Sequence, residues 1–307
     1  MGKRTWRNYA DWAKKRDVAL RVADRLGRGR GRLRFLDRLV TPVASQFVPN
    51  LDDWESRDLS AVWIGHATVL LRIGGKTIIT DPVLSTRVGL GLGLATAGPA
   101  RLVRPAISLK KLPPIDLLLL SHAHFDHLDR PTLSRLSKRI PVVTAMHTTD
   151  LIRDLGYRKI YELGWNQSVD VEGLKITGRQ VAHWGARTFL DRHRGFNAYL
   201  IESAKHRVLY GGDTAFFEGF RDIGPVDLAI FGIGAYNPYL AAHATPEQAW
   251  EMAQHVHAAH VLPMHHSTFK LSYEPIEEPL QRMIAAAGAH ANRLVCKHIG
   301  QEWKLTG

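Results

Sequence analysis

One short segment of the chain concentrates side chains that bind metal ions: Ser121-His122-Ala123-His124-Phe125-Asp126-His127. It brings three imidazoles and one carboxylate together without a thiolate, a donor set that suits a borderline cation such as zinc. In an extended turn, side chains at i and i+2 point the same way, so His122 and His124 can hold one ion. Asp126 and His127 lie beyond the turn, where they can hold a second ion. The segment therefore predicts two adjacent metal sites.

The spacing His-x-His-x-Asp-His resembles the signature of the metallo-β-lactamase superfamily of binuclear hydrolases. A lone His-x-His would be weak evidence, but the other elements of that family's pattern also have counterparts here in the same order. These counterparts are Asp81 in Ile79-Thr80-Asp81-Pro82, His183 in Val181-Ala182-His183-Trp184, Asp213 in Gly211-Gly212-Asp213-Thr214 and His265 in Pro263-Met264-His265-His266.

The resemblance implies a role for each of these residues. Asp213 would bridge two divalent ions, which lie about 3.5–4 Å apart in two-metal hydrolases. Asp81 would support the histidine loop from behind the ligands, and a capped turn before Pro82 is the alternative interpretation. Zinc is the expected metal, with manganese or iron as alternatives. The remaining ligands would be His122, His124 and His183 for the first ion, and Asp126, His127 and His265 for the second.

Further motifs narrow the resemblance to one branch of the superfamily. This branch contains N-acylphosphatidylethanolamine phospholipase D and the ascorbate-6-phosphate lactonases, and the similarity is stronger to the phospholipase side. Because fold and metal site do not fix a substrate, the substrate is a separate inference. The motifs are Trp63-Ile64-Gly65-His66-Ala67-Thr68, Thr80-Asp81-Pro82-Val83, Pro113-Pro114-Ile115-Asp116, Ile233-Gly234-Ala235-Tyr236 and His243-Ala244-Thr245-Pro246-Glu247-Gln248-Ala249.

Three other histidines lie near these motifs. His243 precedes a predicted helix start, with Thr245 as the cap. In the phospholipase-like branch the matching histidine lines the active site, where it could bind a phosphoryl oxygen or protonate the leaving group; a surface position is the alternative. His66 would either support the metal site or pack beside a strand end. His266 stands where that branch often has tryptophan, and it points away from His265 if the segment is extended.

The expected chemistry is hydrolysis by a hydroxide that bridges two metal ions, because both charges favour the deprotonated water. Asp126, Asp213 and His243 are the expected catalytic residues. A phosphodiester, including a glycerophospholipid, is the favoured substrate. A lactonase acting on a sugar-phosphate lactone or similar ester is the alternative, and a nuclease is less favoured because no recognised nucleic-acid-binding fold is evident. Asp213 argues against a dedicated β-lactamase, which typically carries cysteine or serine at that place.

The positive charge of the chain is concentrated near its N-terminus. The formal net charge is +12, and residues 1–38 hold thirteen Lys and Arg residues against four Asp. We expect residues 1–58 to form a basic helical arm, with a helix over 11–26, and residues 59–307 to form the hydrolase domain. Such an arm could contact anionic lipid or pack on the body. Nucleic acid is a less favoured partner.

Composition and hydropathy favour a cytoplasmic enzyme, with contact at the inner face of the membrane as a further option. No apolar run reaches the ~20 residues that span a bilayer, and no apolar region of a signal peptide follows the basic N-terminus. Cys296 is the single cysteine, so no intrachain disulfide can form. It lies outside every ligand motif, and we expect a buried, inert thiol.

The pattern of apolar residues predicts an α/β fold, a four-layer αββα sandwich with the ligands in loops or at strand ends. Gly74-Gly75 indicates a hairpin turn. Residues 88–100 are apolar and glycine-rich without a clear period, and they could form a pocket lid, contact acyl chains or be a covered loop. Strands are predicted over 61–64, 69–73, 76–80, 117–120, 142–144, 174–177, 197–201, 207–210, 228–231 and 260–263. Helices are predicted over 131–138, 148–155 and 246–257.

Overall fold

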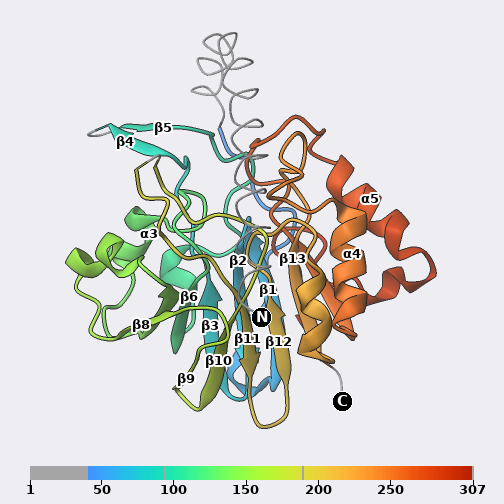
Figure 1. Cartoon of the computed structure of the whole chain (residues 1–307), viewed down its shortest axis with the longest axis horizontal. Helices are drawn as coiled ribbons and strands as arrows, with labels where there is room; N and C mark the ends of the chain where they lie inside the picture. Colours follow the sequence, from blue (N-terminus) through green and yellow to red (C-terminus); the bar gives the residue numbers. More distant parts are fainter. Residues whose placement is uncertain (1–40, 93–94, 189, 306–307) are drawn as a thin grey trace, which may run out of the picture.

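The computed structural model describes residues 41–305 except 93, 94 and 189. Two β-sheets stack face to face and helices lie outside them, which confirms the predicted αββα sandwich (Figure 1). The first sheet has the order β15(Glu302–Lys304), β1(Leu59–Gly65), β2(Thr68–Ile73), β3(Lys76–Thr80), β6(Leu117–Leu120), β7(Val142–Ala145), β8(Ile160–Leu163). The second has the order β14(His260–Met264), β13(Leu228–Gly232), β12(Arg207–Tyr210), β11(Ala198–Glu202), β10(Leu174–Arg179), β9(Ser168–Val171).

The core lies between the two sheets, and smaller apolar layers lie under the helices. Strand β6 shows how the sequence builds this arrangement, because its four leucines are all buried. Leu117 and Leu119 join the core between the sheets, whereas Leu118 and Leu120 face the outer layer of the first sheet. Side chains of a strand alternate between its two faces, so a strand buried on both sides reads as a continuous apolar run.

Helices cover the outer face of each sheet. α4(Pro246–His255) and α5(Glu278–Ala287) pack on the second sheet, and α3(Arg130–Arg135) lies over the first (Figure 1). Helix α4 begins as predicted, because the side chain of Thr245 accepts a hydrogen bond from the backbone N–H of Gln248 and the side chain of Gln248 accepts one from the backbone N–H of Thr245. Short 3₁₀ helices complete the layers: η2(Trp54–Ser56), η3(Leu109–Lys111), η4(Thr149–Leu151), η5(Arg153–Leu155), η6(Glu218–Ile223) and η7(Gly288–Arg293).

The predicted strands are all present, but two segments differ from expectation. The helix expected over 148–155 is wrong: η4 and η5 replace it, because the backbone of Ile152 leaves the helical conformation between them (φ −128°, ψ −2°). Residues 88–100, which have no clear period, form a hairpin of β4(Leu90–Leu92) and β5(Ala95–Ala97). This hairpin projects beyond the sandwich (Figure 1).

The predicted helix over 11–26, with most of the predicted arm, lies outside the described residues. The described part of the arm ends against the body, where Trp54 is buried and donates a hydrogen bond to Thr77. The division at residue 58 stays a prediction. Within the described ranges, no helix has the length and apolar character needed to cross a bilayer.

Candidate metal centre

The predicted ligands come from loops that follow the ends of four strands. The loop of residues 121–127 follows β6, His183 follows β10, Asp213 follows β12 and His265 follows β14. Strands β12, β13 and β14 are parallel neighbours, as are β3, β6 and β7, so their carboxyl ends share one edge of each sheet. Stacking the two sheets therefore brings these loops together at one end of the sandwich.

Three histidines meet in what we call the first cluster: His122, His124 and His183. The Nδ1 atom of His124 lies 2.8 Å from Nε2 of His122 and 3.3 Å from Nε2 of His183. Nδ1 of His183 donates to the carbonyl oxygen of Ala242 at 2.9 Å, so the lone pair of its Nε2 is available to a metal ion. This set is the one that the sequence predicted for the first ion.

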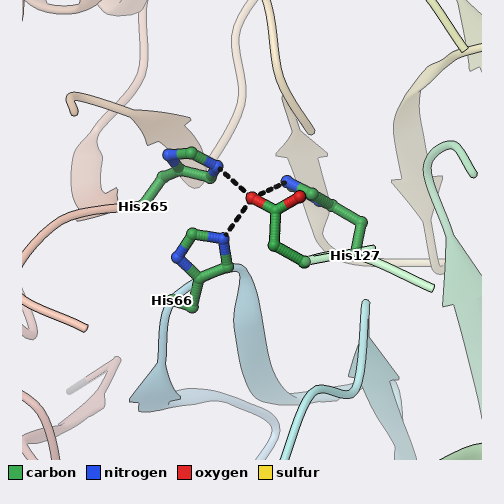
Figure 2. A group of neighbouring side chains, drawn as sticks. His66, His127 and His265 are labelled. Atoms are coloured by element: carbon green, nitrogen blue, oxygen red, sulfur yellow. Dashed lines mark hydrogen bonds and ion pairs between the residues drawn. The ribbon is translucent and has the colours of Figure 1, made fainter. Parts of the chain in front are cut away.

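The second cluster contains Asp126, His127 and His265. Oδ2 of Asp126 lies 3.4 Å from Nε2 of His265 and 3.8 Å from Nε2 of His127 (Figure 2). His66 reaches the same carboxylate, with its Nε2 atom 2.9 Å from Oδ2 of Asp126. The sequence left open whether His66 supports the site or packs beside a strand end, and the structure places its ring within hydrogen-bond distance of Asp126.

Asp213 lies between the two clusters. Its Oδ2 atom is 3.1 Å from Nε2 of His127 and 3.2 Å from Nε2 of His265. The same oxygen is 4.0 Å from Nε2 of His122 and 3.8 Å from Nε2 of His183. One carboxylate therefore faces histidines of both clusters, which is the position expected for a bridging ligand.

The donor atoms of these residues fit divalent metal ions. Oδ1 of Asp213 and the Nε2 atoms of His127 and His265 are buried and form no hydrogen bond within the described chain. Buried polar atoms normally have partners, and orphaned ones point to an ion or another bound group. Imidazole nitrogen and carboxylate oxygen are the ligands that zinc, manganese and iron share. The assignment of each residue as a ligand stays a prediction.

Asp81 lies behind the histidine loop and forms hydrogen bonds with two of its residues. Its carboxylate accepts hydrogen bonds from the backbone and hydroxyl of Ser121, at 2.7 and 2.5 Å. It also accepts one from Nδ1 of His127 at 2.6 Å, which leaves the Nε2 lone pair of His127 directed at the cluster. The hydroxyl of Tyr210 donates to the same carboxylate at 2.6 Å. Asp81 thus connects the loop to both sheets.

Burial lowers the pKa values of the histidines in the centre, whereas nearby carboxylates raise them. Burial lowers the pKa values of His122 and His183 well below the ordinary value. Burial also opposes protonation of His265, but Asp213 and Asp126 outweigh it and raise the pKa of His265 to about 9. Because a metal ligand must be the unprotonated imidazole, metal binding at His265 would release a proton at neutral pH.

The structure places His243 beside the two clusters, and its role in the reaction stays a prediction. Its Nδ1 atom is 3.8 Å from Oδ2 of Asp213, and 13% of its side chain is exposed. Burial lowers the pKa of His243 to about 4, so its ring is neutral at pH 7. His266 points away from the ligands and packs on Trp63, with ring centroids 4.5 Å apart.

Sequence reasoning missed several groups that hold the site together. Arg187 donates through Nη1 to the carbonyl oxygens of Ala123 and Leu128, both at 2.9 Å, and so spans the loop between them. The Tyr210 hydroxyl and the Ala242 carbonyl contact Asp81 and His183, respectively. For Arg187, the one indication in the sequence was its position four residues after the predicted ligand His183. The other two contacts depend on folding and leave no mark in the sequence.

Comparisons with known proteins agree with this geometry. The family model described as the beta-lactamase superfamily domain matches residues 76–266. An uncharacterised protein of Mycobacterium tuberculosis is 35% identical over 259 residues, which cover 80% of this chain and 68% of that protein. The N-acyl-phosphatidylethanolamine-hydrolyzing phospholipase D 1 of Caenorhabditis elegans is 29% identical over 282 residues, covering 83% of this chain and 78% of that protein.

A solved structure gives the same answer for the fold. The isothiocyanate hydrolase from Delia radicum gut bacteria superposes with a TM-score of 0.65 at 17% identity, and the match covers 80% of this chain and 99% of that one. The matched family spans more than half of the sequence and includes every predicted ligand. This chain therefore belongs to the metallo-β-lactamase superfamily and is a metal-dependent hydrolase of that superfamily.

Proposed function

We propose that this protein is a binuclear phosphodiesterase that cleaves a lipid phosphodiester. The observation that carries the proposal is the Asp213 carboxylate, which faces histidines of both clusters and so provides for two ions, not one. The name of the similar Caenorhabditis elegans protein, a phospholipase D, supports a phosphodiester as the substrate. Zinc is the proposed metal, with manganese or iron as alternatives.

Each group of residues in the centre has its own proposed role. The first and second clusters would each hold one ion, and Asp213 would contact both. Divalent ions bound there would lower the pKa of a coordinated water and stabilise negative charge on a phosphoryl group. Asp81 keeps His127 in the tautomer that presents Nε2 to the centre. No serine or cysteine nucleophile is needed for such a reaction.

His243 is the proposed contact to the substrate. It is partly exposed beside Asp213, whereas the ligands His122, His183 and His265 are buried. A neutral imidazole carries one N–H donor, which suits a hydrogen bond to a phosphoryl oxygen. Because the pKa of His243 is lowered to about 4, this role is favoured over delivery of a proton to the leaving group at neutral pH.

Exposed apolar side chains on the loops around the centre support a lipid as the substrate. These loops follow Asp81, His183 and His265 or precede His243, and they meet at one end of the sandwich (Figure 1). In their described residues Asp191 and Glu274 are buried, while Lys270 and Glu277, the residue before α5, are exposed. A rim of exposed apolar side chains fits a lipid surface. The exposed apolar residues are Leu90 (55%), Leu190 (94%), Leu240 (56%) and Tyr273 (47%).

Turnover on two soluble substrates tests the reaction. Protein reconstituted with zinc should cleave bis-p-nitrophenyl phosphate, and a chelator should abolish the cleavage. The matched substrate is δ-valerolactone, which tests the lactonase alternative under the same conditions. Cleavage of the lactone without cleavage of the phosphodiester would contradict the proposal.

Vesicle binding tests the lipid surface separately. The full chain should sediment with vesicles of phosphatidylcholine that contain phosphatidylglycerol. Replacing Leu190 and Leu240 with Asp should weaken this binding and leave cleavage of bis-p-nitrophenyl phosphate unchanged. The matched control is Ile284→Asp, because Ile284 is also exposed (41%) but lies on α5. Equal binding by the rim variant and the control would exclude the rim as the contact surface.

A further inference from the structure

His66 contacts the Asp126 carboxylate beside His265, with the ring centroids of His66 and His265 4.1 Å apart. Figure 2 shows the rings of His66, His127 and His265 directed at one carboxylate oxygen. The Nε2 atom of His66 is the nearest to that oxygen, Oδ2 of Asp126, at 2.9 Å. His265 and His127 are farther from it, at 3.4 and 3.8 Å. The short distance is that of a hydrogen bond from the imidazole to the carboxylate.

We infer that His66 is a positioning residue that holds Asp126, and with it His265, in place for the second metal ion. A carboxylate oxygen has two lone pairs. If one accepts a hydrogen bond from His66, the other remains directed at the cluster. The hydrogen bond thus fixes the rotation of the carboxylate before an ion binds, which is the usual role of the groups behind metal ligands. The inference rests on the proposed two-metal centre.

The main chain of His66 supports the same conclusion. Its carbonyl oxygen accepts a hydrogen bond from the backbone N–H of His265 at 3.1 Å. Its own N–H donates to the hydroxyl of Thr268 at 2.8 Å, and Nε1 of Trp63 donates to its carbonyl at 2.8 Å. One residue therefore contacts two members of the second cluster, through its side chain and its backbone, and is itself held on both sides.

The local backbone explains how a residue so early in the sequence reaches the cluster. The pairing of β1 with β2 shifts register between Trp63 and Gly65. Gly65 then has φ of 137° and His66 has φ of 55°, both in the region that favours glycine. This turn directs the ring of His66 into the metal end of the sandwich, where it packs edge-to-face with the ring of Phe269, with the ring centroids 5.1 Å apart.

The role of His66 predicts that the two metal sites respond differently to its loss. The possible ligand atoms of His66, Asp126, His127 and His265 lie within 4.8 Å of one another, and those of the first cluster lie equally close to Asp213. Removing the hydrogen bond should therefore weaken the second ion and spare the first. Losses of about 10–100-fold in metal affinity are typical when such a supporting group is removed.

Zinc titration of the metal-free protein by calorimetry measures both affinities without any substrate. His66→Leu should keep one tight site and weaken the other about 10–100-fold. His66→Gln should restore the second site, because a glutamine amide can present an N–H donor at the position of Nε2. The matched control is His266→Gln, since His266 is a neighbouring buried histidine that makes no contact with a ligand carboxylate. Thermal unfolding of each variant checks that the fold is intact.

The outcomes separate the alternatives. Recovery of the second site in His66→Gln but not in His66→Leu supports a positioning role. Failure of both variants to bind the second ion would overturn it, since that result requires the imidazole itself as a ligand. Equal weakening of both sites, or of neither, would also overturn it. Two normal zinc sites in a wild-type protein that cleaves no phosphodiester would refute the proposed function and leave this inference standing.

Discussion

The two ends of the sandwich differ in how deeply they bury their charged side chains. At the metal end, the side chains of Asp81 and Asp213 are at most 2% exposed and lie among buried histidines. At the far end, where the same strands begin, His206 lies between Asp58 and Asp227, at 3.2 and 3.5 Å. The side chains of Asp58 and Asp227 are 50% and 34% exposed.

The difference shows which end is built for a ligand. Charges that reach solvent at the far end are stabilised by water as well as by their partners, so each pair contributes little. Buried charges lack that stabilisation and need a compensating group. At the far end one buried ring nitrogen, Nδ1 of His206, has no hydrogen bond in the described chain, whereas the metal end has several such atoms, including Oδ1 of Asp213 and Nε2 of His127 and of His265. A bound cation would supply the missing partner.

The strongest test of this comparison is Asp213→Ala. Loss of the shared carboxylate should reduce metal content and lower kcat/KM by more than the roughly 10–100-fold typical of supporting residues. Metal analysis and turnover of bis-p-nitrophenyl phosphate measure the two effects. Asp227→Ala at the far end is the matched control and should change neither. Full activity with two ions in Asp213→Ala would refute the bridging role.

Asp81→Asn should have the next largest effect. An amide cannot accept hydrogen bonds at both of its ends, so the contacts from Ser121, His127 and Tyr210 cannot all be kept. We expect metal affinity to fall about 10–100-fold, and the fold to lose stability because a buried network is broken. Zinc titration and thermal unfolding measure these changes. An unchanged affinity would mean that Asp81 serves the fold alone.

His243→Ala should lower kcat while metal content stays intact. The hydrogen bond proposed for this ring acts on the substrate, so its loss should cost about 100-fold in rate. Activity and metal content are measured on the same sample. A parallel fall in metal content would instead identify His243 as a ligand.

The smallest effect is expected at the far end, from Asp58→Asn. The hydrogen bond from His206 lowers the pKa of Asp58 below its usual 3.8. A lowered folded-state pKa stabilises the protein above the unfolded value, and this contribution disappears as the pH falls through the folded-state pKa. The variant should therefore be less stable at pH 7 by at most about 1 kcal/mol, and the difference should vanish in strong acid. Urea unfolding at several pH values measures it.

The metal centre could be predicted from the sequence to the extent that its ligands occupy local motifs. His122, His124, Asp126 and His127 are adjacent in the chain, and each remaining ligand follows a recognisable apolar strand. Alternation and apolar runs locate such strands, and parallel strands deliver their carboxyl ends to one edge. The ligand positions therefore followed from local patterns together with the family's order.

Features that depend on distant contacts were not predictable in this way. The contact of His66 with Asp126 requires a shift in strand register and an unusual backbone at Gly65. Strand β15 pairs with β1, which lies far away in the sequence, so no local pattern in its three residues indicates a strand. Strands β8 and β9 and helix α5 were also not anticipated. The helix expected over 148–155 breaks at Ile152, whose backbone conformation no local sequence signal indicates.

The metal content of the purified, zinc-reconstituted protein tests the central claim most directly. Elemental analysis of wild type and Asp213→Ala, at matched protein concentration, gives the number of ions per chain. Two clusters that share Asp213 predict two ions in the wild type and fewer in the variant. A wild-type protein that retains no metal, or a variant that retains two ions with full activity, would contradict the binuclear centre.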